Sequence, residues 1–372
     1  MRLILTTIFL MITITTVYSE EIIYPPVESM IGQMIIAGFR EPEITEDMPI
    51  AQSIKSGEVG GVILFDYDIV LRSNRRNIIS PAQLTRLISQ IKLLSQDMPL
   101  FIGIDQEGGI VSRLKEQLGF RASASQQALG TSNNEALTRR EYSFSAEQLS
   151  RLGINLNFAP VVDLNINPDN PVIARYRRSF SADPQIVVRN AGFALDEFRR
   201  QNIIGVIKHF PGHGSSVTDT HLQITDVTET WTDSELIPYN ELISSGITDI
   251  IMTAHIFNRN LDPDFPATLS RKILAGILRE QLNFDGVIIT DDMNMRAITD
   301  HYGFEEAIAL AINAGADIIL VGNNLVYERN IAHITYNTIL NLFRSGIISE
   351  ERIRESYRRI TAIKRGYLFL TE

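Results

Sequence analysis

Eight short apolar runs, rich in β-branched residues, alternate with helical patterns along this chain. The runs carry little polar alternation, which is typical of strands buried on both faces. They comprise residues 33–39, 59–65, 100–104, 155–162, 203–207, 248–254, 286–290 and 317–321. The helical patterns comprise residues 80–96, 134–152, 184–200, 234–245, 270–281, 304–314 and 326–345. Eight strands that alternate with helices predict an α/β fold, a (β/α)8 barrel of the TIM type.

A doubly wound open sheet fits the same alternation of strands and helices. That fold favours a glycine-rich phosphate turn, Gly-x-Gly-x-x-Gly, after an early strand, and the sequence has no such motif there. The 372 residues allow either two ordinary domains or one large barrel. Because the predicted strands extend over nearly the whole chain, we expect a single barrel domain at residues 20–372 and no second domain.

Composition narrows the classes of partner and chemistry. With 34 Lys and Arg against 44 Asp and Glu, the formal net charge is −10, which disfavours nucleic acid as a partner. The chain has no cysteine. Disulfides, thiolate metal sites and a cysteine nucleophile are therefore excluded.

The first 19 residues have the pattern of a secretory signal peptide. Arg2 precedes a mostly apolar run at residues 3–17, and small residues follow before Glu20. The run is shorter than the roughly 20 residues that a membrane-spanning helix needs. We expect cleavage after Ser19, a periplasmic or secreted protein, and no membrane span in the mature chain. The alternative is an uncleaved N-terminal anchor.

Titratable side chains end several of the predicted strands or follow them directly. They are Asp105, Asp163, Lys208, His209, His255, Asp291 and Asp292. Barrel enzymes place their chemistry at the C-terminal ends of the strands. One shared active site explains this series better than a succession of independent helix caps.

The segment Lys-His-Phe-Pro-Gly-His-Gly at 208–214, with its continuation to His221, contains three of the six histidines. Asp219 lies two residues before His221, so its carboxylate can orient the imidazole for proton transfer. Two other interpretations remain open from the residues alone. Zinc could be bound by His209, His213, Asp219 and His221, or the segment could be a structural loop.

Two more segments carry candidate side chains. In the segment 286–293, Asp291 ends a buried strand, where it can serve as nucleophile, base or metal ligand, or simply cap a helix; Asp292 is the more structural of the pair because adjacent strand residues point in opposite directions. In the segment 102–114, Asp105 and Arg113 suit a ligand rich in hydroxyl groups. A salt bridge that fixes the loop explains this second pair equally well.

Several motifs together resemble glycoside hydrolase family 3, and within it the β-N-acetylglucosaminidase branch of the NagZ type. They are Gly-Ile-Asp-Gln-Glu-Gly-Gly at 103–109 with Val-Ser-Arg-Leu at 111–114, Phe-Ala-Pro-Val-Val-Asp at 158–163, Arg-Ser-Phe at 178–180, the loop at 208–214 with Asp-x-His at 219–221, and Thr-Asp at 290–291. The resemblance runs in order from about residue 31 to 363. Basic residues at 175–177 depart from the pattern.

The resemblance implies a role for each matching residue. Asp291 corresponds to the nucleophile, and His221, paired with Asp219, corresponds to the general acid and base. The residues that correspond to sugar-binding positions are Asp105, Arg113, Arg178, Lys208 and His209. The family resemblance also implies that no metal or cofactor takes part.

These roles lead us to expect a retaining enzyme that hydrolyses terminal β-linked N-acetylglucosamine, or a related N-acetylhexosamine, from cell-wall or chitin-type glycans. The partner is then a glycan substrate, and we expect a monomer. Two alternatives are a phosphorylase on the same scaffold, in which phosphate replaces water, and a glycan-binding barrel without catalysis.

Overall fold

The computed structural model describes residues 24–95, 98–221 and 224–369. The predicted signal segment 1–19 lies outside these ranges. Eight parallel strands form the central sheet in the order β10-β1-β2-β3-β4-β5-β7-β9. Their bounds are β1 Ile35–Gly38, β2 Gly61–Leu64, β3 Phe101–Ile104, β4 Leu156–Asn157, β5 Ile204–Phe210, β7 Ile250–Thr253, β9 Val287–Ile289 and β10 Ile319–Val321.

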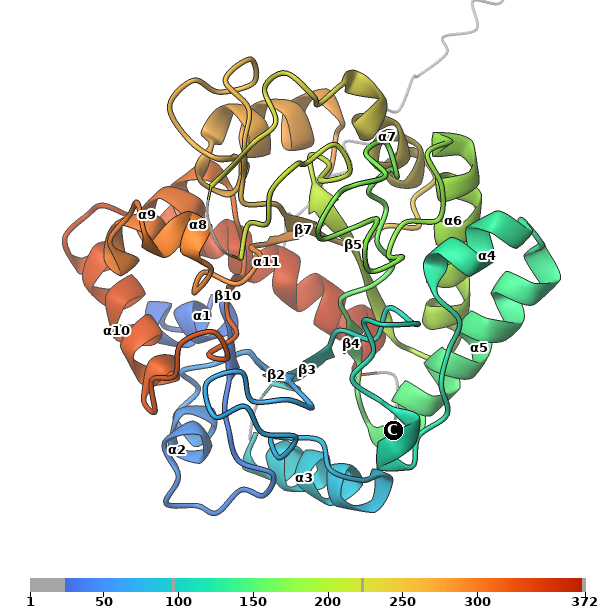
Figure 1. Cartoon of the computed structure of the whole chain (residues 1–372). Helices are drawn as coiled ribbons and strands as arrows, with labels where there is room; N and C mark the ends of the chain where they lie inside the picture. Colours follow the sequence, from blue (N-terminus) through green and yellow to red (C-terminus); the bar gives the residue numbers. More distant parts are fainter. Residues whose placement is uncertain (1–23, 96–97, 222–223, 370–372) are drawn as a thin grey trace, which may run out of the picture.

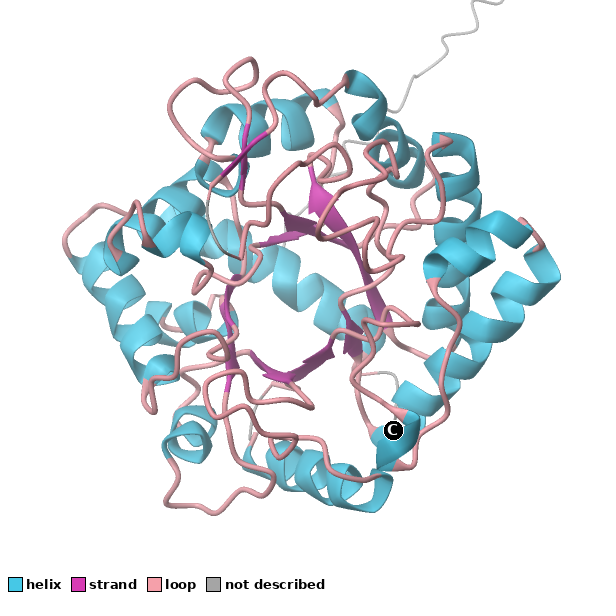
Figure 2. Cartoon of the chain, in the orientation of Figure 1, coloured by secondary structure: helices cyan, strands magenta, loops and turns pink. Residues whose placement is uncertain are grey.

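The sheet closes into a barrel where its two edge strands meet. Ile289 pairs with Ile318 in a parallel bridge, and the backbone N–H of Asp317 donates to the carbonyl of Ile288 at 2.7 Å. Figures 1 and 2 show the strands as a ring with helices around it. The predicted (β/α)8 barrel is confirmed, and the open-sheet alternative is wrong.

Helices surround the barrel, and six of the eleven α-helices in the described ranges lie in predicted segments. The α-helices are α1 Val27–Gln33, α2 Pro49–Lys55, α3 Pro81–Leu94, α4 Gln126–Ser132, α5 Glu135–Leu152, α6 Pro184–Arg200, α7 Ile237–Ser244, α8 Arg296–Thr299, α9 Phe304–Ala314, α10 Ile331–Arg344 and α11 Glu350–Tyr367. Shorter 3-10 helices are η1 Glu116–Leu118, η2 Asp233–Leu236 and η3 Ala267–Leu269, and η4 Lys272–Gln281 is a π-helix. A small second sheet pairs β6 Thr225–Asp226 with β8 Ile256–Phe257.

Three predicted boundaries are corrected by the structure. The strand expected at 155–162 pairs regularly only at Leu156–Asn157, because Pro160 has no N–H to donate to a neighbouring strand. The strand expected at 203–207 continues to Phe210. The helix expected at 326–345 begins only at Ile331.

Helix α11 was not predicted, yet it packs against the N-terminal ends of the strands, which we call the lower end of the barrel. Its N-cap Ser349 accepts a hydrogen bond from the backbone N–H of Arg352. Near its other end, Lys364 donates to the carbonyl of Gly60, which directly precedes β2. In Figure 1 this red helix lies behind the ring of strands, so it crosses their N-terminal ends and leaves the opposite end to long loops. None of the helices in the described ranges combines the length and apolar character needed to cross a membrane.

Candidate active site

The loops at the C-terminal ends of the strands surround a cavity of about 500 Å³. All eight residues to which the family resemblance gave a role line it: Asp105, Arg113, Arg178, Lys208, His209, Asp219, His221 and Asp291. The fold therefore brings together side chains that are up to 186 residues apart in sequence (291 − 105). Their individual roles remain predictions.

Asp219 orients the imidazole of His221. Its Oδ1 lies 2.7 Å from Nδ1 of His221 and also accepts the backbone N–H of His221 at 2.8 Å. This contact leaves Nε2 as the nitrogen that can exchange a proton with a ligand. Burial alone would lower the pKa of His221, but the hydrogen bond to Asp219 and the negative charges of Asp291 and Asp219 raise it overall. The imidazolium form is therefore stabilised.

Asp291 follows β9 and Thr290 and lines the same cavity. Its Oδ1 accepts the backbone N–H of Asp292 at 2.8 Å. Burial by itself would raise the pKa of Asp291, but the neighbouring histidines His255, His209 and His221 lower it overall. The carboxylate is therefore ionised near neutral pH, the state that a nucleophile requires.

The adjacent Asp292 has different surroundings. Its Oδ1 accepts the backbone N–H groups of Asn294 at 3.0 Å and Gly322 at 2.8 Å. Burial raises its pKa to about 6. A Cβ added at Gly322 would come within 2.5 Å of Asp292 Oδ2, so glycine is required for this close contact. These contacts give Asp292 a part in fixing the loop after β9, although Asp292 also lines the cavity together with Asp291.

The polar wall of the cavity is a network of ion pairs. Lys208 Nζ lies 2.9 Å from Asp105 Oδ1 and 2.8 Å from Glu107 Oε1. Arg178 binds Glu107 through two hydrogen bonds of 2.7 and 2.8 Å, and Arg113 contacts Asp105 at 3.3 Å. Burial opposes ionisation of Asp105, but Lys208 and Arg113 hold its pKa well below the usual range. Fixed charges of both signs suit a ligand that is rich in hydroxyl groups.

Sequence reasoning gave no role to Glu107 or Asp163, although both support the site. Asp163 Oδ2 lies 2.7 Å from His209 Nδ1, and its Oδ1 accepts the backbone N–H groups of His209 and His213. Arg178 Nη2 lies 3.3 Å from the other ring nitrogen of His209. Asp163 was recognisable as a strand-end residue, and Glu107 lies in the same motif as Asp105, but no local pattern indicates their partners.

Glycines allow close packing at the base of the histidine loop, the segment at residues 208–221. A Cβ at Gly214 would meet the carbonyl oxygen of Leu164 at 1.8 Å, and Gly212 has φ +122°. The side chain of Asn170 donates to the carbonyls of His213 and Gly214, and Glu235 accepts the N–H of Gly214 at 2.9 Å. The base of this loop is thus held by side chains from outside it.

In the parts of the chain that the structure describes, no set of side chains converges in a way that could bind zinc. Across residues 24–95, 98–221 and 224–369, no three His, Cys, Asp or Glu side chains gather in a metal-binding arrangement. His209 already contacts Asp163 and Arg178, and His213 Nε2 lies 3.2 Å from Thr220 Oγ1. The expected absence of a metal remains a prediction.

Comparison with known proteins finds a matching glycosyl hydrolase family and relatives that are named beta-hexosaminidases. The family model described as "Glycosyl hydrolase family 3 N terminal domain" matches residues 27–363. Beta-hexosaminidase A from Pseudoalteromonas piscicida is 31% identical over 340 residues, which cover 85% of this chain and 54% of that protein. A beta-hexosaminidase from Tolumonas auensis is 37% identical over 272 residues, which cover 72% of this chain and 76% of that protein.

Solved structures with the same barrel include a glycoside hydrolase family 3 β-N-acetylglucosaminidase from Paenibacillus sp. Its TM-score is 0.84 at 34% identity, and the match covers 92% of this chain and 63% of that one. Zinc-bound CbsA from Thermotoga neapolitana has a TM-score of 0.78 at 26% identity, and the match covers 91% of this chain and 68% of that one. This chain therefore spans about half to three quarters of the length of these four proteins.

Proposed function

We propose a function from the premise that the chain belongs to glycosyl hydrolase family 3. In this proposal it hydrolyses terminal β-linked N-acetylglucosamine, or a related N-acetylhexosamine, with retention of configuration. The observation that carries the proposal is the meeting of Asp291 with the Asp219–His221 pair in one cavity. The names of the hexosaminidase relatives support the choice of sugar.

In the first step, Asp291 attacks the anomeric carbon of the bound sugar. The bond from that carbon to the glycosidic oxygen breaks, and His221 donates its proton to the departing oxygen. A covalent glycosyl-aspartate forms. The lowered pKa of Asp291 keeps the nucleophile ionised, and the raised pKa of His221 keeps a proton available for transfer.

In the second step, neutral His221 accepts a proton from water as the oxygen of that water attacks the anomeric carbon. The bond to Asp291 breaks, and the sugar leaves with the configuration it had in the substrate. Asp219 stays ionised and stabilises the imidazolium that forms. Retaining enzymes usually divide these roles between two carboxyl groups; an imidazole, with an ordinary pKa of about 6.5, suits the same exchange near neutral pH.

The ion-pair network would hold the sugar for this reaction. Asp105 accepts hydrogen bonds from sugar hydroxyls, and Lys208, Arg113 and Arg178 donate them. Because each of these groups already contacts a protein partner, its position is fixed before the substrate arrives.

The test is hydrolysis of chromogenic β-N-acetylglucosaminide beside the matching β-glucoside, with and without phosphate. We expect the N-acetylated substrate to be strongly preferred and its rate to be independent of phosphate. A rate that depends on phosphate would instead identify a phosphorylase. Binding of chitobiose without turnover of any substrate would favour the non-catalytic barrel, and preference for the glucoside would overturn the proposal.

We further propose a periplasmic or secreted monomer. The support for secretion is Arg2 with the apolar run at 3–17, which lies outside the described residues. N-terminal sequencing of protein from its native host should begin at or near Glu20, and light scattering should give the mass of one chain. Full-length protein in the cytosolic fraction would contradict the proposed secretion.

A further inference from the structure

Exposed apolar side chains gather at the mouth of the cavity. Among the described residues, twelve large apolar side chains are exposed, and six of these stand on the three loops that follow β2, β3 and β4. We call five of the six the mouth patch: Ile69, Ile110 and Tyr176, which line the cavity, and Val70 and Leu71, which follow Ile69 in the same turn. Their loops follow β2, β3 and β4, which are neighbours in the barrel, as Figure 1 shows. The patch therefore occupies one continuous arc of the mouth.

The first of these loops is held rigidly although its tip is apolar. Asp68 and Ser73 exchange two backbone hydrogen bonds, of 2.8 and 3.1 Å, across the turn. Asp68 also accepts the N–H of Leu71 at 2.7 Å, and Asn324 accepts the N–H of Ile69 at 3.2 Å. The fully buried Arg76 donates to both Asp68 and Asn324. Buried polar contacts thus hold this turn in place, while its three apolar side chains, Ile69, Val70 and Leu71, are exposed to water.

The other two loops present their apolar side chains in the same way. Ile110 is 56% exposed and stands between Gly108 and Val111, which pair in an antiparallel bridge. Tyr176 is 37% exposed, and its turn is closed by hydrogen bonds that include the N–H of Arg178 to the carbonyl of Ile173 at 3.0 Å. Ordered loops lose little conformational entropy when a ligand covers their tips.

The patch is continuous with the proposed active site, because Ile69, Ile110 and Tyr176 also line its cavity. The charged groups that suit the terminal sugar, such as Asp105 and Lys208, lie at the strand ends, whereas the patch lies at the loop tips. A sugar bound against the charged groups would direct its glycosidic oxygen and leaving group toward the mouth. The occupant of the patch is then the leaving group of the substrate.

From this arrangement we infer that the mouth patch is a leaving-group subsite for an alkyl or aryl aglycone. The inference rests on the proposed function and specifies its substrate. A second sugar ring would gain few hydrogen bonds from the patch, because four of the five patch side chains are purely hydrocarbon. An alkyl or aryl group gains by the burial of apolar surface alone.

The test compares octyl with methyl β-N-acetylglucosaminide, both below the critical micelle concentration. Each is cleaved by water to N-acetylglucosamine and the corresponding alcohol. We expect kcat/KM to be about tenfold higher for the octyl glycoside, an effect equal to burying roughly two methylene groups. Ile69→Ser combined with Leu71→Ser should lower this octyl-to-methyl ratio at least about fivefold. Leu93→Ser is the matched control, because Leu93 is 84% exposed on α3, away from the cavity.

Each other outcome has a defined meaning. Equal kcat/KM values for the two glycosides in the wild type, or a ratio that the double variant leaves unchanged, would overturn the inference. Preference for N,N′-diacetylchitobiose over the octyl glycoside would assign the subsite to a second sugar. Loss of binding to phosphatidylglycerol vesicles with an unchanged ratio would assign the patch to a membrane surface. Turnover of chromogenic β-N-acetylglucosaminide but of neither alkyl glycoside would overturn the inference alone, whereas no turnover of any of the three would overturn the proposed function itself.

Discussion

Both ends of the barrel bury charged side chains, but they arrange them differently. At the C-terminal end, the charges of Asp105, Lys208 and Asp291 face a cavity of about 500 Å³. At the N-terminal end, Asp317 lies two residues before the start of β10, is fully buried, and is enclosed by its partners. Its two oxygens accept hydrogen bonds from Arg279, the backbone N–H of Ile288, Arg352, Ser356 and Arg359.

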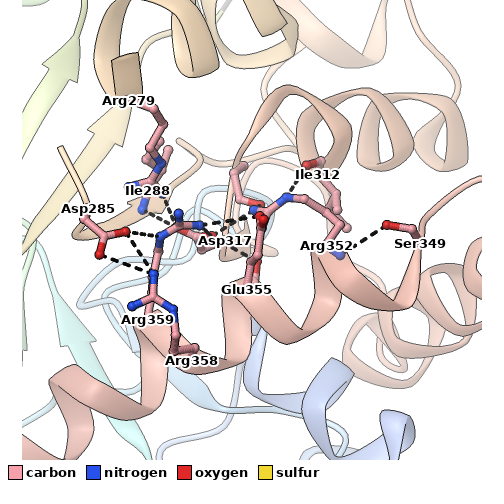
Figure 3. A network of polar contacts seen from close by, with 12 residues as sticks. Arg279, Asp285, Ile288, Ile312, Asp317, Ser349, Arg352, Glu355, Arg358 and Arg359 are labelled. Atoms are coloured by element: carbon pink, nitrogen blue, oxygen red, sulfur yellow. Dashed lines mark hydrogen bonds and ion pairs between the residues drawn. The ribbon is translucent and has the colours of Figure 1, made fainter. Parts of the chain in front are cut away.

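Figure 3 shows how Asp317 joins three elements of the lower end. Arg279 comes from η4, Ile288 from β9, and Arg352 and Arg359 from α11. Burial alone would raise the pKa of Asp317, but the three guanidinium groups lower it overall. A carboxylate whose hydrogen-bonding capacity is used by the protein fixes the fold, whereas charges that line a cavity can also contact a ligand. This contrast separates structural from catalytic charge here, and the following variants test it.

The largest effect is expected at the cavity. Asp291→Asn keeps the side-chain shape and removes the charge, so no glycosyl-enzyme can form. We expect a loss of at least about a thousandfold in kcat/KM with little change in melting temperature. Trapping with a slow substrate, followed by mass spectrometry, should label the wild type at Asp291. A variant within tenfold of the wild type would assign the nucleophile elsewhere, with Asp292 examined first.

Asp317→Asn is the counterpart at the lower end. It leaves three partly buried arginines without their shared counter-charge, and we expect the free energy of unfolding to fall by about 3 kcal/mol. The kcat of the molecules that remain folded should stay within about twofold, because Asp317 does not line the cavity. Urea denaturation and active-site-normalised kinetics measure the two quantities. A large loss of kcat at unchanged stability would contradict the separation of the two ends.

His221→Ala should affect substrates unequally. A poor leaving group needs protonation as it departs, so we expect a loss of about a hundredfold, whereas an activated phenol should lose far less. Asp219→Ala should show a weaker version of the same inequality, because it removes only the group that orients and charges the imidazole. A series of aryl glycosides with different phenol pKa values measures this. Equal losses across the series would mean that His221 binds sugar and another group supplies the proton.

Titration of Lys364, at the lower end of the barrel, should change the free energy of unfolding without changing kcat. Burial lowers its pKa to about 7, from an ordinary value of 10.5. Between these values the unfolded chain binds more protons, so the free energy of unfolding should rise with pH, by up to about 1.4 kcal/mol per pH unit. Below pH 7 this contribution is flat.

Lys364→Met should remove this rise while leaving the pH profile of kcat unchanged. Urea denaturation of both proteins at pH 7, 8 and 9 isolates the difference. Parallel stability curves for the wild type and the variant would show that Lys364 does not titrate in this range.

The smallest expected effect concerns metal. If Asp219 and His221 act as a proton-transfer pair, dialysis against a chelator should leave the rate within about twofold. A site built from His209, His213, Asp219 and His221 would instead lose activity and regain it with zinc. Metal analysis of the dialysed protein is the accompanying control.

The sequence indicated the barrel through eight strands whose burial on both faces leaves a local signature. It placed Asp291 and the Asp219–His221 pair near each other because strand ends share one side of a parallel barrel. Helix α11 escaped prediction because its residues are mostly polar or charged, and only its packing against the barrel selects the face that is buried.

The local pattern by itself determined strand identity, loop glycines and the spacing of Asp219 and His221, since these depend on neighbours within a few residues. Only the tertiary structure decided which charges meet. Glu107 pairs with Arg178 across 71 residues, and Asp163 reaches His209 across 46. Strand order and register place these groups within hydrogen-bond distance, and burial then makes each partner necessary. No short-range periodicity carries that information.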